Sequence, residues 1–222
     1  MRKFFYTFLL FGVLANSYGQ ISLGGYVGTN NATFTSIPRD STRLTQNLGL
    51  VLGLQFSIPL KEDILLSIDP AFAVERSGVE VVDTLALTTL NTRNPTIEAI
   101  WLDTADFSFQ QIQIPVLAKV LSKNRQWTYI GGLGLSIPLN LRLYNDTGDY
   151  RFNDLTKISL EGIMGFGYQL NLKRNSLNLG VRFHQSLTRT TVFNEDLKRL
   201  SGLKTRSLRI ILSWRIRLKK DS

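Results

Sequence analysis

Alternation of apolar and polar residues, repeated in about eight segments, constrains this chain more than any other feature of its sequence. In the clearest segment, Asn47 to Ile58, every second residue from Leu48 onward is large and apolar. Successive side chains of a β-strand point to opposite faces of the sheet, so this pattern predicts a strand with one apolar face. We therefore expect an all-β protein.

The expected strands are joined alternately by long and short connectors. They span 21–28, 47–58, 64–75, 107–121, 127–143, 157–172, 176–187 and 205–218. The longest connector, 76–106, holds about thirty residues, which is unusual inside a compact soluble domain and ordinary on the outer side of a membrane barrel. The pattern predicts an eight-stranded antiparallel up-and-down transmembrane β-barrel whose short turns face the periplasm.

A soluble β-sandwich or lipocalin-like barrel is the main alternative, because those folds also alternate and also bind ligands. The length of the expected strands favours the membrane, since a tilted strand needs about 9–11 residues to cross the bilayer core. Aromatic residues near the strand ends favour it too, because they are typical of the girdles at membrane interfaces. These residues are Phe107, Phe109, Trp127, Tyr129, Tyr144 and Trp214.

The N-terminal segment has the pattern of a secretory signal peptide. Two cations, Arg2 and Lys3, precede an apolar run of about a dozen residues, and the small residues Ser17 and Gly19 predict cleavage after Gly19. After that point no apolar stretch approaches the ~18 residues of a transmembrane helix. We expect a signal peptide at 1–19 and one barrel domain at 20–222, exported to the outer membrane.

Composition excludes several other classes of protein. Cysteine is absent and histidine occurs once, so we expect no disulfide, no metal site and no cofactor. The formal net charge is +9, but the cations are spread over turns, loops and the last strand, without an aromatic-rich basic face. Binding of nucleic acid is therefore not expected.

The inward-facing positions collect charged side chains. The expected interior charges are Asp69, Glu75, Lys119, Glu161, Arg182, His184, Arg209 and Arg215. One hypothesis is a charged pathway for small solutes or ions. The other, which we favour, is a plug of paired charges, because the interior of an eight-stranded barrel is just wide enough for side chains to fill it.

Three residues are candidates for catalysis. His184, Ser186 and Glu195 could serve as base, nucleophile and orienting acid of an acyl-transfer site, as in a lipid A-modifying hydrolase. Alternation turns His184 and Ser186 inward, whereas a hydrolase of acyl chains needs a nucleophile that is open to lipid. We expect no enzyme activity, and we expect His184 to be a hydrogen-bonded filler of the interior.

Five segments resemble the PorT-like outer-membrane β-barrel family of Bacteroidota. They are LSIDPAF at 66–72, IQIPVLAK at 112–119, YIGGLG at 129–134, GFGY at 165–168 and RFHQSL at 182–187. The resemblance implies an eight-stranded barrel in the outer membrane, and some members resemble the barrel component of a secretion system. This chain departs from the family at Gln113, where members often carry Glu, and at 218–222, which lacks the usual terminal aromatic residue.

The long connectors are the remaining functional candidates, because loops on a rigid scaffold carry binding. We expect the barrel to contact outer-membrane lipid. We expect connectors 76–106 and 188–204 to contact surface or secretion-system proteins, or glycans. The sequence thus predicts a structural, binding or secretion-associated role at the cell surface, with a small-solute channel as the alternative.

Overall fold

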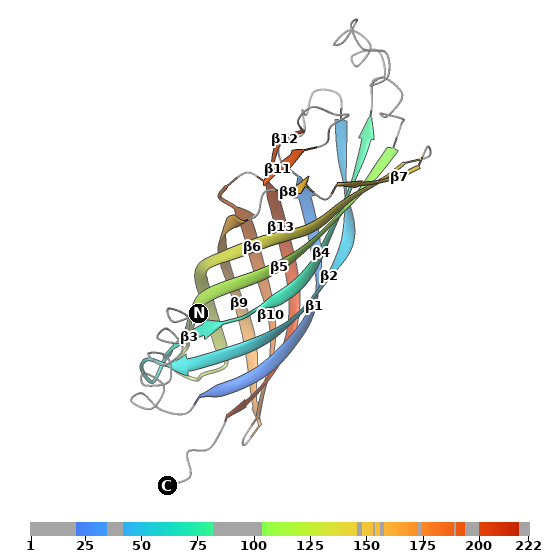
Figure 1. Cartoon of the computed structure of the whole chain (residues 1–222). Helices are drawn as coiled ribbons and strands as arrows, with labels where there is room; N and C mark the ends of the chain where they lie inside the picture. The colour runs from blue at the N-terminus through green and yellow to red at the C-terminus, as the bar shows by residue number, and fades with distance from the viewer. Residues whose placement is uncertain are drawn as a thin grey trace, which may run out of the picture.

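The computed structural model describes residues 21–34, 42–81, 104–145, 148–152, 154–155, 158–172, 175–188, 190–193 and 200–217, and its regular elements are β-strands (Figure 1). Within these ranges, no helix is long and apolar enough to cross a membrane. The signal peptide expected at 1–19 lies outside the described residues.

Antiparallel strands close into a barrel with eight wall positions, which confirms the predicted fold class. The wall strands are β1 (Ser22–Phe34), β2 (Thr42–Pro59), β3 (Ile64–Ile68) with β4 (Ala71–Val81), β5 (Thr104–Leu121), β6 (Trp127–Asn145), β9 (Ser159–Leu172), β10 (Asn175–Ser186) and β13 (Thr205–Arg217). Wall neighbours pair in chain order, and β1 pairs with β13 to close the ring. Closure pairs the backbone groups at both edges of the sheet, which lipid cannot hydrogen-bond.

The third wall strand, expected to be continuous over 64–75, is interrupted at Asp69 and Pro70. Proline has no backbone N–H to donate to the ladder, so the regular pairing stops there. The register with the second wall strand is the same before and after this interruption, because Ile68 pairs with Phe56 and Ala71 pairs with Gly53. β3 and β4 are therefore one wall strand with a local break.

The long-connector end contains more strand than expected. β1 runs on to Phe34, β4 runs on to Val81, and β7 (Gly148–Phe152) pairs with the end of β6. The expected connector 188–204 contains β11 (Thr190–Phe193) and β12 (Leu200–Leu203), which form a small sheet with β8 (Asp154–Leu155). Figure 1 shows this sheet at the opposite end from the short turns. Pairing between distant loops leaves no local sequence pattern.

The outer wall is apolar. Large apolar side chains such as Leu50 (64% exposed) and Met164 (63% exposed) point away from the interior. Exposed apolar residues in such number mark a surface that is not covered by water. This wall is the lipid-facing surface of a membrane barrel.

Two aromatic residues were placed wrongly by the girdle prediction. Phe107 is 4% exposed and Phe109 is 3% exposed, and both lie inside the barrel. The odd-numbered positions of β5 point inward there, as the buried Gln111 also shows. The other four residues of that set, Trp127, Tyr129, Tyr144 and Trp214, are exposed on the outer wall.

Two β-bulges shift the alternation near the long-connector end. The pairing of β2 with β4 shifts between Asn47 and Leu50, and the pairing of β5 with β6 shifts at Gln110 and Gln111. A bulge inserts one extra residue and re-aims the side chains beyond it. As a result Leu141 of β6 is fully buried, although continued alternation would turn it outward.

Candidate functional site

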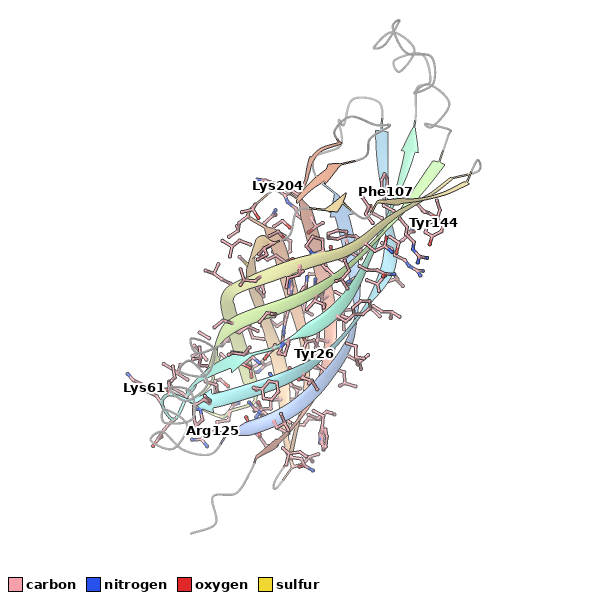
Figure 2. All side chains as sticks on the ribbon, in the orientation of Figure 1. Tyr26, Lys61, Phe107, Arg125, Tyr144 and Lys204 are labelled. Atoms are coloured by element: carbon pink, nitrogen blue, oxygen red, sulfur yellow. The ribbon has the colours of Figure 1, made fainter. Side chains whose placement is uncertain are left out.

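The barrel interior brings together charged side chains from five wall positions. All eight charged residues assigned to the interior from the sequence are buried in it. They form groups around Asp69, around Arg209 and around Arg215. Figure 2 shows the side chains that project into the barrel and away from it.

Asp69 is the centre of the first group. Its Oδ2 lies 3.0 Å from Lys119 Nζ and 2.9 Å from Arg182 Nη2. Its Oδ1 accepts a hydrogen bond from the Ser67 hydroxyl. Asp69 has no exposed surface, so one fully buried carboxylate serves two buried cations.

The break in the third wall strand helps to place this carboxylate. The Tyr26 hydroxyl crosses from β1 and donates to the Asp69 carbonyl oxygen at 2.9 Å. The Tyr26 ring also lies 5.3 Å from the Arg182 guanidinium carbon, which is a cation–π contact. Gly53 of β2 leaves room for this ring, because a Cβ there would lie 2.4 Å from Tyr26 Cζ.

The second group starts at Arg209 and spans five strands, β4, β5, β9, β10 and β13. Its Nη2 lies 2.9 Å from Glu75 Oε1, and its Nη1 donates to Gln113 Oε1. Gln113 Nε2 in turn donates to Glu161 at 3.2 Å, and Glu161 Oε2 lies 3.3 Å from His184 Nδ1. The amide of Gln113 therefore links a cation to a carboxylate. A glutamate at this position would add a third carboxylate to the group.

Arg182 and Arg209 are direct cross-strand partners on β10 and β13. Like charges directly opposite one another repel, which is destabilising in a sheet. Their side chains reach different partners: Arg182 reaches Asp69, and Arg209 reaches Glu75 further along the same wall strand. The two arginines thus have different carboxylate partners.

Arg215 lies in the third group, near the short-turn end, where two of its partners are neutral. Its Nη2 donates to Gln169 Oε1 at 2.8 Å, and its Nε donates to Ser176 Oγ at 3.1 Å. The cavity that Arg215 lines together with Lys119 and Arg182 has a volume of about 20 Å³. That volume suits about one water molecule.

The candidate catalytic residues have separate partners. His184 contacts Glu161, whereas Ser186 Oγ lies 2.8 Å from Thr205 Oγ1. His184 and Ser186 are both buried inside the barrel, away from the lipid-facing wall. Glu195 lies outside the described residues. An acyl chain in the bilayer has no access to Ser186 Oγ in this arrangement.

Sequence reasoning missed the neutral members of the interior network. These are Tyr26, Ser67, Gln113, Gln169 and Ser176. Alternation places each on an inward face, so the signal was available. The predicted interior site included charged groups only, although neutral amides and hydroxyls satisfy much of a buried charge.

A closed barrel with an apolar outer wall and an interior filled by hydrogen-bonded charges is an integral membrane β-barrel. Residues 15–192 match the family described as outer membrane protein beta-barrel domain. The chain belongs to this family and is an outer-membrane protein.

Solved structures with a similar fold share little sequence with this chain. Neisserial surface protein A is 12% identical, with a TM-score of 0.47 over 90% of this chain and 99% of that chain. Ail, the attachment invasion locus protein of Yersinia pestis, is 11% identical, with a TM-score of 0.47 over 89% and 100%. OprG from Pseudomonas aeruginosa is 14% identical, with a TM-score of 0.47 over 91% and 97%. No curated protein sequence matches the chain.

Proposed function

We propose that this protein is a non-enzymatic outer-membrane barrel that acts at the cell surface through its long connectors, in a structural, binding or secretion-associated role. The signal peptide at 1–19 directs its export. The partners are surface or secretion-system proteins, or glycans, that meet connectors 76–106 and 188–204. The five segments that resemble the PorT-like family of Bacteroidota support placing the protein in that family.

The filled interior is the observation that carries this proposal. Asp69 and Arg209 connect opposite parts of the wall through buried charges, and Phe107, Phe109 and Leu141 occupy the interior nearer the long-connector end. A barrel whose interior is packed leaves its ends to contact partners. The strands that extend beyond the apolar wall then carry the long connectors.

Surface labelling tests which end of the barrel faces outward. The sequence has no cysteine, so Thr88→Cys in the longest connector and Lys123→Cys in a short turn each introduce a single thiol. We expect a membrane-impermeant maleimide to label Thr88→Cys on whole cells, because long connectors of outer-membrane barrels are extracellular. Lys123→Cys should react only after the outer membrane is permeabilised. The reverse pattern would contradict the proposed orientation.

Planar-bilayer conductance tests the filled interior against a small-solute channel. We expect purified, refolded protein to give no stable unitary current, because the paired charges and their amide partners occupy the path. The double substitution Glu75→Ala and Arg209→Ala, which removes one buried ion pair, should raise the frequency of openings. Stable unitary currents from the parent protein would favour the channel.

A further inference from the structure

A row of polar residues crosses the outer wall near the long-connector end. Direct cross-strand pairing joins Asn47 to Arg76, Arg76 to Ser108, and Ser108 to Arg142. Paired residues share a face of the sheet. Arg76 is exposed, Asn47 and Arg142 are half-buried and Ser108 between the two arginines is 8% exposed, while Glu75 beside Arg76 is buried in the interior. The row therefore faces outward, away from the interior charges.

A pocket of about 520 Å³ opens at this row. It is lined by Asn47, Leu48, Arg76, Asp106, Phe107, Ser108 and Tyr144. Arg142 lies beside it, and its Nη1 donates to the Tyr144 hydroxyl at 3.2 Å. Asn47 Nδ2 donates to Asp106 Oδ1 at 2.8 Å, so an amide already binds the carboxylate in the pocket. Figure 2 shows Tyr144 at the end of the barrel opposite Lys61 and Arg125.

The row lies where the outer wall changes from apolar to polar. Phe72 pairs with Ile112 in an exposed apolar row, and the pair of Val74 with Gln110 follows it toward the long-connector end. The pair of Arg76 with Ser108 comes next. At about 3.4 Å per residue, the polar row lies roughly 14 Å along the strands from the apolar row. In an outer-membrane barrel this is the level of the lipid headgroups.

The two β-bulges make this row possible. The shift in β2 lies between Asn47 and Leu50, and the shift between β5 and β6 lies just below Ser108. Without the second bulge, the alternation of β6 would turn Leu141 outward and Arg142 inward. Bulges commonly re-aim side chains at functional positions.

We propose that this pocket binds the phosphate-bearing headgroup of an outer-leaflet glycolipid of the lipid A type. A guanidinium group matches the geometry of a phosphate, and amide and hydroxyl groups suit sugar hydroxyls. The backbones of Arg76 and Arg142 lie two strands apart, roughly 10 Å, so both long side chains can reach one phosphate. This inference rests on the orientation under the proposed function, which surface labelling tests separately.

Titration of the full-length refolded protein in detergent tests the proposal, with bis-phosphorylated lipid A as the probe. We expect Arg76→Gln to weaken binding about tenfold, because it removes a charge-assisted contact. We expect Asp106→Asn to tighten binding by about two- to fivefold, because it removes a repulsive charge and keeps an oxygen for Asn47. A folding defect would weaken binding in both variants, so opposite changes identify an electrostatic site.

Lys61→Gln is the matched control, because it removes one exposed cation from the other end of the barrel and should leave binding unchanged. Dephosphorylated lipid A should bind at least tenfold more weakly than the bis-phosphorylated form, and phosphatidylglycerol should also bind more weakly. Equal binding by Arg76→Gln and the parent would overturn the site. Equal binding of dephosphorylated lipid A would overturn phosphate recognition, and equal binding of phosphatidylglycerol would overturn the choice of a glycolipid.

Discussion

Replacing Asp69 with Asn is expected to lower the free energy of unfolding by about 3–5 kcal/mol, the largest effect of any single charge removal in this barrel. In the parent protein, Lys119 Nζ and Arg182 Nη2 lie 3.0 and 2.9 Å from the Asp69 carboxylate. The substitution keeps the size of the side chain but removes the anion that these two cations share. Breaking a buried pair by removing one partner is strongly destabilising because an uncompensated charge stays buried. Denaturant unfolding in detergent micelles, followed by heat-modifiable gel migration, measures the change.

Glu62→Gln is the control for this prediction. Glu62 lies in an exposed turn, so its loss should change the free energy of unfolding by less than about 0.5 kcal/mol. Combining Asp69→Asn with Lys119→Gln should recover part of the stability, since it removes one of the two unpaired cations. A single Asp69→Asn variant as stable as the parent would show that the cations are satisfied without this carboxylate.

Replacing Gly53 with Ala is expected to cost about 1–3 kcal/mol of stability, because the added methyl group overpacks the interior. A Cβ at this position would lie 2.4 Å from Tyr26 Cζ and 2.7 Å from the Pro70 carbonyl oxygen. The Tyr26 ring has little freedom to retreat, because its hydroxyl bonds to Asp69 and its face contacts Arg182. We expect a lower unfolding midpoint in the same micelle assay.

Gly131→Ala provides the comparison. Gly131 lies on the exposed outer wall, and a Cβ there meets no heavy atom within 4 Å. This variant should be as stable as the parent or slightly more stable, because Ala loses less conformational freedom than Gly on folding. If both variants lost the same amount of stability, the loss would reflect a general cost of replacing strand glycines. The contact of Gly53 with Tyr26 would then not explain it.

The lipid-facing positions illustrate how much of the fold could be predicted from the sequence. Leu50 and Leu52 alternate with Gly49 and Val51, and the structure exposes the leucines and buries their neighbours. Alternation is a local property of an extended backbone, so it survives in the sequence of a single strand. The same rule fails beyond a bulge, where one extra residue reverses the faces of Leu141 and Arg142.

The interior network shows what a local pattern cannot contain. Alternation assigns Asp69, Glu75, Arg182 and Arg209 to one side of the wall, but it does not say which cation meets which carboxylate. Arg182 lies 113 residues from Asp69 in the chain, and Arg209 lies 134 residues from Glu75. Those pairings depend on the register of every strand between them.

The sequence by itself determined the alternation, the number of wall strands and the order of short and long connectors, because these features follow from local backbone geometry and turn chemistry. Only the tertiary structure decided the break at Pro70, the ion pairs of the interior and the outward row of Asn47, Arg76, Ser108 and Arg142. Closure of the barrel and its two bulges bring distant residues to one level of the wall. That arrangement cannot be predicted from any single segment of the sequence.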